Sequence, residues 1–263
     1  MCKPSTDITR KQYKLGQTGR PALTHDSGFS AFKKEKPTDA DYNMRAAWRL
    51  ALEASETVRP DMADGNGAYR HYHEGKGKRR RFSYDRYVRN DKHGAQTLRN
   101  AILEAQGAAN KLWQASGRKA SFSFTGPGIR CGSKDPNLAR IYPYPSSENW
   151  QKAIGAHWIW LTGDVTVDVD PQGKRPPNFT MQLTLHAEDR YNFNPNDHDI
   201  TTGLADKLNG RFVVVGLAHE YTSYSSLTRR VAWSGSAAGL SATPHQGPRS
   251  RQPTDNRRPS NRL

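Results

Sequence analysis

The sequence has few cysteines and no long apolar run. Cys2 and Cys131 are the only cysteines among 263 residues. Two are too few for a disulfide framework or a cysteine-based zinc site, and we expect both thiols to be free. No uninterrupted apolar stretch reaches the roughly 18 residues that a transmembrane helix needs. Residues 1–7 lack the apolar segment of a secretory signal peptide. A disulfide-stabilised fold, a membrane-spanning helix and export by a signal peptide are therefore not expected.

Acidic residues are also scarce relative to basic ones. The chain has 25 Asp and Glu against 40 Lys and Arg, which gives a formal net charge of +15. Residues 76–92 contain eight basic and two acidic residues, and residues 249–262 contain five arginines and one aspartate. Basic segments of this kind contact nucleic-acid phosphates or anionic membrane surfaces, or simply stay solvated. The charge alone leaves these three interpretations open.

Apolar residues make up only 34% of the chain and are unevenly distributed. Residues 1–40 and 236–263 are polar and rich in proline, glycine, serine and basic side chains. Because such segments bury too little apolar surface to offset their ordering entropy, we predict two disordered tails, the second of them basic. The remaining residues are enough for a hydrophobic core. We divide them into a helical portion, 41–120, and a β-rich catalytic domain, 121–235.

Apolar residues at helical spacing predict helices in the first half of the chain. The clearest helix spans residues 95–115, where an apolar stripe recurs every three or four residues and Gly117 follows as a stop. Residues 41–58 show the same periodicity and end before Pro60, since the residue before a proline disfavours the helical conformation. A shorter helix is predicted over 63–73.

Alternating apolar and polar residues predict strands in the second half. Residues 121–124, 157–169 and 179–186 alternate in this way, and the last two form a predicted antiparallel hairpin. Residues 211–221 and 227–233 are predicted to add two more strands. The second half of the chain therefore contains enough strands for a sheet.

Helices followed by strands indicate an α+β fold with an antiparallel sheet. We expect N-terminal helices followed by a curled antiparallel sheet, a half-barrel, with disordered termini. Two segments are less regular. Residues 82–89 alternate only in part and are predicted as a strand or as a loop with aromatic anchors. Residues 130–150, which contain several prolines, are predicted as a loop.

The densest group of polar side chains follows the strand at 179–186. Residues 186–199 contain three Asp, one Glu, two His, one Tyr and one Arg. If strand alternation continues, Asp189 and Tyr191 point to one side, and the turn brings His198 back toward Asp189. Such a group could bind a divalent cation through the carboxylate and use the histidine as general acid or base. The Asn-Pro-Asn-Asp sequence is also ordinary turn chemistry, so a structural role is the alternative.

The spacing of these residues resembles the active-site signature of colicin M-like bacteriocins, Asp-x-Tyr-Asp-x5-His-Arg. Asp189, Tyr191 and His198 stand at matching positions. Asn192 stands where the family usually has aspartate, and Asp199 where it usually has arginine. The resemblance implies a secreted antibacterial toxin whose catalytic domain contains a half-barrel sheet.

The resemblance covers roughly residues 155–235, and it implies a phosphoester hydrolase that acts on lipid II. The bond cleaved would join the undecaprenyl lipid to the pyrophosphate, with a dependence on Mg²⁺. By this resemblance, Asp189 would hold Mg²⁺ or orient a water, and Tyr191 would bind a phosphoryl oxygen. His198 would be the general base or acid.

Three further residues form the predicted substrate-binding set. Arg190 or Arg211 would supply the positive charge that position 199 lacks, and Asn192 completes the set. The resemblance also implies an immunity protein as a partner. We expect secretion without a signal peptide, action in the periplasm of a target bacterium, and a cytoplasmic location in the producer.

Two other functions remain open. Phe82, Tyr84 and Tyr87 are interleaved with arginines, and such a pattern suits single-stranded nucleic acid. A nuclease toxin could use His198 and Asp189 equally well. A non-catalytic effector or adaptor module on the same scaffold is the third interpretation.

Overall fold

The computed structural model of the chain describes residues 13–17, 19–195, 197–198, 203 and 205–236. Its central feature is a sheet in which the strands follow the order β1-β3-β5-β6-β7-β2, with β4 paired to β5. The strands are β1 (Lys14–Leu15), β2 (Arg80–Arg81), β3 (Ser121–Thr125), β4 (Ile129–Arg130), β5 (Trp158–Asp168), β6 (Asn178–Tyr191) and β7 (Tyr221–Ser234). The pairings are antiparallel except that β2 runs parallel to β7.

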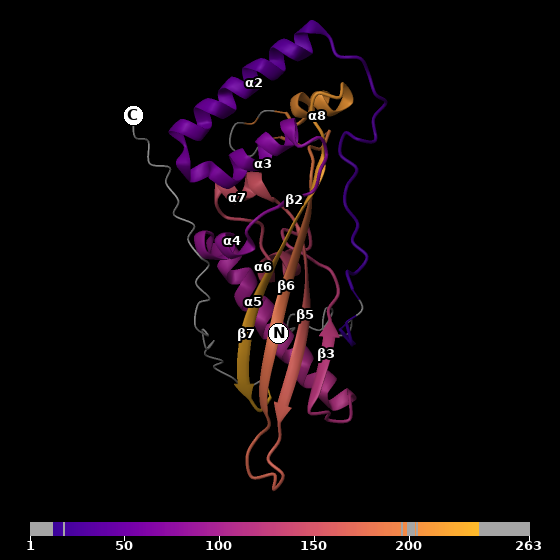
Figure 1. Cartoon of the computed structure of the whole chain (residues 1–263), viewed down its shortest axis with the longest axis vertical. Coiled ribbons are helices and arrows are strands. Elements are labelled where there is room, and N and C mark those ends of the chain that lie inside the picture. The colour runs from indigo at the N-terminus through magenta and orange to yellow at the C-terminus, as the bar shows by residue number, and fades with distance from the viewer. Residues whose placement is uncertain (1–12, 18, 196, 199–202, 204, 237–263) are drawn as a thin grey trace, which may run out of the picture.

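The predicted α+β class is confirmed, with the difference that the sheet is open instead of curled into a half-barrel. A barrel closes only when its two edge strands pair. Here the edges are the two-residue strands β1 and β2, which lie at opposite ends of the strand order. The long strands β5, β6 and β7 form the middle of the sheet (Figure 1).

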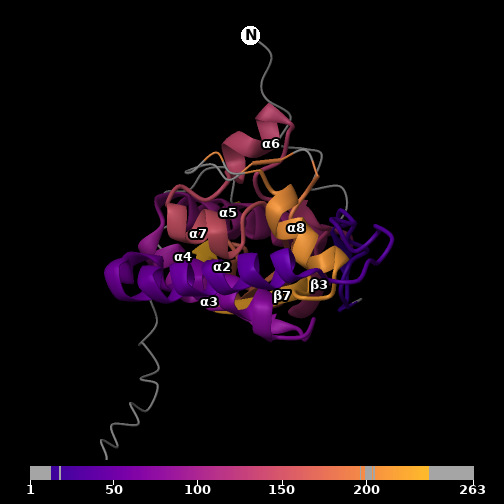
Figure 2. The ribbon, with the colours of Figure 1, turned by 90° about the horizontal axis from the view of Figure 1, so that it is seen from above.

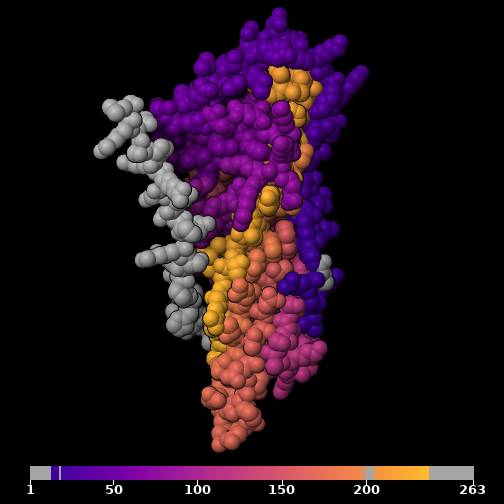
Figure 3. Space-filling model, in the orientation of Figure 1, coloured from indigo at the N-terminus to yellow at the C-terminus, as the bar shows by residue number. Residues whose placement is uncertain are grey.

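The register of the long strands places their odd-numbered residues on one face. Leu161 pairs with Leu185, which pairs in turn with Leu227, and all three are buried. A shift of one residue would move every apolar side chain to the opposite face, so this burial fixes the register. The even-numbered residues of β5 and β6 are more exposed and largely polar, and Figure 3 shows the strands uncovered in the lower half of the molecule.

Helix α5 (Lys92–Ala115) covers the inner face of the sheet (Figure 1). The side chain of Asp91 caps its start by accepting hydrogen bonds from the backbone N–H groups of His93 and Gly94, at 2.9 and 3.1 Å. Buried alanines along the helix allow the strands to approach closely, and Trp113 packs edge-on against Phe179 of β6. Full burial of a large apolar side chain contributes about 1.5–3 kcal/mol, so this interface is the main core of the molecule.

Other helices gather beyond α5 at one end of the sheet (Figures 1 and 2). They are α2 (Asp39–Val58), the 3-10 helix η1 (Pro60–Met62), α3 (Ala63–Glu74), α7 (Glu148–Ala153) and α8 (Lys207–Val214). A second apolar cluster lies there and includes Phe29, Tyr72, Phe212 and Tyr221. None of the helices that the structure describes is long and apolar enough to cross a bilayer.

Several elements lie where the sequence predicts them. The helices predicted over 41–58, 63–73 and 95–115 correspond to α2, α3 and α5. The predicted hairpin corresponds to β5 and β6, although β6 continues five residues further than predicted, to Tyr191. The division into a helical portion and a β-rich domain at residue 120 stays a prediction.

Three segments differ from the prediction. In two of them, 82–89 and 211–221, a short apolar run fits a helix as well as a strand. In the third, 130–150, Pro136 stands in the first turn of a helix, where proline is tolerated. Residues 82–89 contain the start of α4 (Tyr84–Asn90), in which Tyr84, Tyr87 and Val88 are buried at helical spacing. The strand predicted at 211–221 is instead the end of α8 and the turn that follows it. Residues 130–150 contain β4, α6 (Pro136–Ile141) and the start of α7 instead of an irregular loop.

The prediction that residues 1–40 form a disordered tail is wrong for the described part of that segment. Tyr13 and Phe29 are buried, at 7% and 6% exposure. The Tyr13 hydroxyl donates to Glu104 of α5 at 3.2 Å, and the segment runs along one side of the sheet (Figure 1). These contacts join residues far apart in the sequence, so local composition does not reveal them. The basic tail predicted at 236–263 lies outside the described residues except for Ser236.

Candidate functional site

A pocket of about 880 Å³ opens between the end of the sheet and helices α2, α3 and α7. Five of the six predicted site residues line it: Asp189, Arg190, Tyr191, Asn192 and His198. Strand β6 delivers the first three of these, and the turn after it delivers the others. The sequence motif therefore corresponds to one continuous site.

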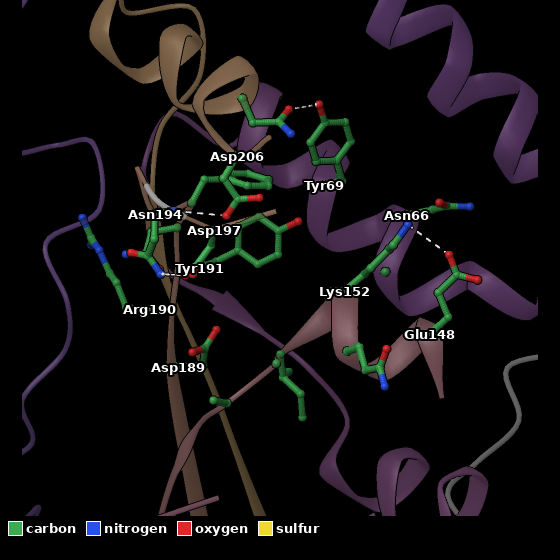
Figure 4. A pocket seen from close by; sticks show the side chains of 18 of the residues that line it. Asn66, Tyr69, Glu148, Lys152, Asp189, Arg190, Tyr191, Asn194, Asp197 and Asp206 are labelled. Carbon is green, nitrogen blue, oxygen red and sulfur yellow. Dashed lines mark hydrogen bonds and ion pairs between the residues drawn. The ribbon is translucent and has the colours of Figure 1, made fainter. Parts of the chain in front are cut away.

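Strand alternation explains which side chains enter the pocket. Asp189 and Tyr191 belong to the odd-numbered residues of β6, which face α5 further along the strand. Because β6 continues beyond the end of α5, these two residues face the pocket instead (Figure 4). The predicted common orientation of Asp189 and Tyr191 is thus what the structure shows.

Asp189 is a buried carboxyl group with 7% exposure. Burial raises its pKa well above the usual range of an aspartate, because removal from water disfavours the charged form. The positive charge of Arg130 opposes this change, whereas the negative charges of Asp26 and Glu188 add to it. The burial of Asp189 therefore favours its protonated form, which can donate a proton.

The strand beside Asp189 contributes an aromatic ring and a hydroxyl group. Tyr191 stacks on Tyr221 of β7, with ring centroids 5.0 Å apart. Ser223 lies opposite Asp189 in the β6–β7 register and is fully buried. Within the described part of the chain, its hydroxyl has no hydrogen-bond partner. Buried hydroxyl groups without a partner are rare in folded proteins, so Ser223 is a further polar group beside Asp189 in the sheet.

Asn192 and Arg190 are held by acidic residues from other parts of the chain. The Asn192 amide donates to Asp26 at 2.7 Å. Arg190 extends to the other side of β6 (Figure 4) and donates to the buried Glu220 at 3.4 Å. Glu220 also accepts the backbone N–H of Phe29 at 2.7 Å. The N-terminal segment is therefore part of the site.

His198 occupies the exposed edge of the pocket, in a turn held by side-chain hydrogen bonds. The Asn194 backbone N–H donates to Asp206 at 3.2 Å, and its side-chain amide donates to Asp197 at 3.0 Å. Asparagine and aspartate thus perform the turn role that the alternative interpretation assigned to them. The same turn also places His198 at the pocket. Asp199 lies outside the described residues.

Part of the pocket wall is apolar, although Asn66, Glu148 and Lys152 on the same helical side are polar (Figure 4). Trp48 and Leu52 of α2 line the apolar part together with Met62, Ile154 and Phe193. The pocket therefore has a polar end, where β6 finishes, and a helical wall that is apolar in part. Such a cavity suits a ligand that is itself polar at one end and apolar at the other.

Positive charge reaches the pocket from three directions. Arg130 lies at its polar end, with its guanidinium 5.5 Å from the ring centroid of Trp158. Lys152 of α7 pairs with Glu148 at 3.0 Å (Figure 4). Arg59 pairs with Asp61 and also with Glu148, at 2.8 and 3.0 Å. Arg130 is the cation whose charge acts on Asp189.

Arg211 is not part of the pocket, which corrects its prediction as a substrate-binding residue. It lies in α8, where it donates to Asp41 of α2 at 2.8 and 3.0 Å and also pairs with Glu35. The carboxyl group of Asp41 has a pKa well below its usual range because Arg211 donates to it. Arg211 therefore fixes α2 to α8.

Two residues of the site, Asp26 and Arg130, are not predicted from the sequence. Asp26 belongs to the predicted N-terminal tail, and Arg130 to the predicted loop 130–150. Neither stands in a recognisable motif, and both reach Asp189 only through the tertiary fold. The sequence offers one hint of Asp26, which is that Asn192 stands where the family signature has aspartate. An amide at this position can donate a hydrogen bond to an acidic residue, whereas a carboxylate cannot.

The pocket does not present a complete set of side-chain ligands for the Mg²⁺ that the family resemblance implies. Among the residues that the structure describes, no group of three or more His, Cys, Asp or Glu side chains is placed to hold an ion. These residues do not fit a resident Mg²⁺, and the dependence on magnesium stays a prediction.

The aromatic residues that suggested nucleic-acid binding face the core. Phe82, Tyr84 and Tyr87 are buried, at 6%, 0% and 0% exposure, so they cannot stack on bases. In the basic segment 76–92, Arg86 pairs with Asp64, and the second basic segment, 249–262, lies outside the described residues. The predicted contacts of these segments with nucleic acid or membranes stay predictions.

Comparison with known proteins gives one distant similarity. No family model and no curated protein matches the chain. Among solved structures, the chain is similar to PaeM, a colicin M-like bacteriocin produced by Pseudomonas aeruginosa, with 15% sequence identity and a TM-score of 0.38. The match covers 65% of this chain and 51% of that one, so it spans about half the length of the bacteriocin.

Proposed function

We propose that this chain is an antibacterial toxin that hydrolyses lipid II at the phosphoester between the polyprenyl lipid and the pyrophosphate. The observation that carries the proposal is the pocket itself. A buried carboxyl, Asp189, lies at its polar end among the residues of the motif, and α2 adds an apolar part to the pocket wall. A polyprenyl pyrophosphate has the matching division into a charged head and an apolar chain.

The proposed reaction needs one proton acceptor and one proton donor. The oxygen of a water molecule forms a bond to the phosphorus next to the lipid, and the bond between that phosphorus and the lipid oxygen breaks. A base takes one proton from the water, and Asp189 donates its proton to the lipid oxygen. The products are the polyprenol and the pyrophosphorylated sugar-peptide. The raised pKa of Asp189 supports its role as the donor.

The other residues bind and orient the pyrophosphate. Tyr191 offers a hydroxyl to a phosphoryl oxygen. Arg130 takes the charge-balancing role that the sequence assigned to Arg190 or Arg211, because its charge acts at Asp189 and Arg211 lies outside the pocket. His198 lies at the exposed edge of the pocket, and the sequence predicts it as a general base or acid.

The test is the incubation of lipid II with the full-length protein, read by thin-layer chromatography, with added Mg²⁺ or with EDTA. We expect release of polyprenol by the wild type and a loss of at least about 100-fold in Asp189→Asn, because general acid catalysis contributes about 10²–10⁴-fold. The two metal conditions measure whether the reaction depends on Mg²⁺.

Asp168→Asn is the matched control, because Asp168 is exposed at the far end of β5. It should retain wild-type activity. Asp189→Asn should be at least as stable as the wild type at pH 7.5, because a carboxyl whose pKa is raised on folding loses stability as the pH rises above its unfolded value. Intact lipid II in every condition would contradict the proposal, and full activity of Asp189→Asn would contradict the role of Asp189.

The proposed toxin would act in the periplasm of a target bacterium and would require an immunity protein in its producer. Single-stranded RNA and DNA incubated with the same preparations test the nuclease alternative. Degradation that is lost in Asp189→Asn while lipid II stays intact would favour that alternative. Binding to a partner that survives Asp189→Asn would favour the adaptor.

A further inference from the structure

We propose that Asp26 is a second catalytic carboxylate of the pocket and accepts the proton of the attacking water. This inference rests on the proposed hydrolysis and names the base for it. Asp26 belongs to residues 19–35, which we call the strap, and the strap reaches the end of β6 from the opposite end of the sequence. No sequence motif assigns this residue a role.

The first observation is the contact between Asp26 and the motif. The Asn192 amide donates to the Asp26 carboxylate at 2.7 Å, and both residues line the pocket with Asp189. Two carboxylates at this distance would repel each other, whereas an amide donor orients one carboxylate and satisfies part of its hydrogen-bonding capacity. The amide at position 192 is therefore matched to an acid at position 26.

The second observation is that the strap is held on both sides of Asp26. On one side, the Trp158 indole donates to the Thr24 carbonyl at 3.0 Å, and His25 contacts the buried Glu188 at 3.0 Å. On the other side, the Phe29 N–H donates to Glu220 at 2.7 Å. Contacts of this kind position a reacting group before the substrate binds.

The backbone next to Asp26 is also shaped for this position. Gly28 has a φ of +51°, and a Cβ atom there would meet Glu220 and would lie 2.7 Å from the Asn192 amide nitrogen. Phe29 then packs directly on the backbone of Gly210 in α8, where an added Cβ would meet its ring. The absence of a side chain at Gly28 thus allows the backbone next to Asp26 to pack against Asn192 and Glu220.

The third observation is the difference between the two carboxyl groups. Asp189 is buried, whereas Asp26 is exposed at the open side of the pocket. The negative charge of Asp26 acts on Asp189 and favours its protonated form. Two carboxyl groups in different environments are a common way to divide acid and base roles. The buried group keeps its proton for the leaving oxygen, and the exposed group can return a proton to water.

Asp26 takes a proton from water while the water oxygen bonds to phosphorus, the bond from phosphorus to the lipid oxygen breaks, and Asp189 gives its proton to that oxygen. Asp26 ends protonated and Asp189 ends ionised, and exchange with solvent restores both. Asp26 thus takes the base role that the sequence assigned to His198.

The test exchanges the two side chains. Lipid II hydrolysis is measured for full-length wild type, Asp26→Asn, Asn192→Asp, the double variant Asp26→Asn/Asn192→Asp, and His198→Gln. We expect Asp26→Asn to lower kcat at least about 100-fold with little change in KM. We expect the double variant to recover at least about tenfold over Asp26→Asn, because the carboxylate returns on the other side of the same hydrogen bond. His198→Gln should stay at least about tenfold faster than Asp26→Asn.

A purely structural role for Asp26 predicts a different result. The asparagine of Asp26→Asn still offers an oxygen to the Asn192 amide, so the strap would stay bound and kcat would be unchanged. Protection of residues 19–35 from limited proteolysis reports whether the strap is bound in each variant, and Asp168→Asn is the control for the same chemical change at an exposed site. Wild-type kcat in Asp26→Asn would overturn the proposal, and so would a double variant as slow as Asp26→Asn. If Asp26→Asn is slow only because its strap is released, the proposal also fails. If the wild type leaves lipid II intact, the proposed function fails as well, which separates the two failures.

Discussion

At the scale of single residues, His73 combines burial with a lack of hydrogen bonds. It is 4% exposed and lies edge-on to Tyr69, with ring centroids 4.7 Å apart. Within the described residues, neither ring nitrogen has a hydrogen-bond partner. Burial lowers its pKa to about 4, and the charges of Arg45 and Arg49 add to this effect. His73 is therefore neutral in the folded protein at every pH above about 4.

This predicts a loss of stability in mild acid. The unfolded chain binds the proton near pH 6.5, whereas the folded chain binds it only near pH 4. Between these values the unfolded state holds more protons, so stability falls as the pH falls. His73 contributes about 2 kcal/mol of this loss at pH 5. Replacing His73 with Phe should remove that part of the difference between urea unfolding at pH 7.5 and at pH 5.

The control is the same substitution at His219, which is exposed. His219→Phe should keep the pH dependence of the wild type. An unchanged pH dependence in His73→Phe would mean that the acid sensitivity originates elsewhere. The buried His157 is one such source, because its pKa is also lowered to about 4 by burial.

At the scale of elements, the strap depends on the glycine turn that follows Asp26. The positive φ of Gly28 alone should make Gly28→Ala lower the free energy of unfolding by about 1–2 kcal/mol. The contacts of the added carbon with Glu220 and Asn192 should increase this loss further. We therefore expect faster proteolysis of residues 19–35 and slower hydrolysis of lipid II.

Gly173→Ala is the control that separates the cost of a positive φ from the cost of the contacts at Gly28. Gly173 lies between β5 and β6 with a φ of +67°, and an added Cβ there has no atom within 4 Å. The backbone cost is thus similar, but the strap is untouched. If both variants lose the same stability and show the same proteolysis, the contacts of Gly28 do not hold the strap.

Sequence periodicity correctly predicts those helices and strands that bury a single face, because their apolar residues then recur at the helical or the strand spacing. The stripe of α5 and the alternation of β5 and β6 each correspond to a single apolar face. In α8 the residues Phe212, Val213 and Val214 are all buried, so no periodicity remains, and β-branched residues favour the wrong assignment. The residues of the β6 motif were predictable for the same reason that β6 was, whereas Asp26 and Arg130 were not, because their neighbours are set by tertiary contacts.

At the scale of the whole molecule, the pocket joins two structural layers. The sheet supplies Asp189 and Tyr191, and α2 supplies part of the apolar wall. Ala51→Trp on α2 should fill part of this wall and raise KM for lipid II at least about tenfold, with little change in kcat, because the reacting end lies on β6. Such a change corresponds to about 1.4 kcal/mol of lost binding.

Ala46→Trp provides the matched control. Ala46 is exposed on the same helix and does not line the pocket, so KM should be unchanged. If Ala51→Trp also leaves KM unchanged, α2 does not bind the lipid chain of the proposed substrate.

The strap also determines when during synthesis the pocket can become complete. The hydrogen bond between Asn192 and Asp26 joins residues 166 positions apart, and that between Phe29 and Glu220 joins residues 191 positions apart. Closing a loop of this length costs about 4–5 kcal/mol of chain entropy, so the strap binds only after β6 and β7 offer it a surface. A ribosome-bound chain that has not yet reached residue 220 therefore carries Asp26 without its anchors. The producing cell meets the assembled pocket only after translation has passed that point.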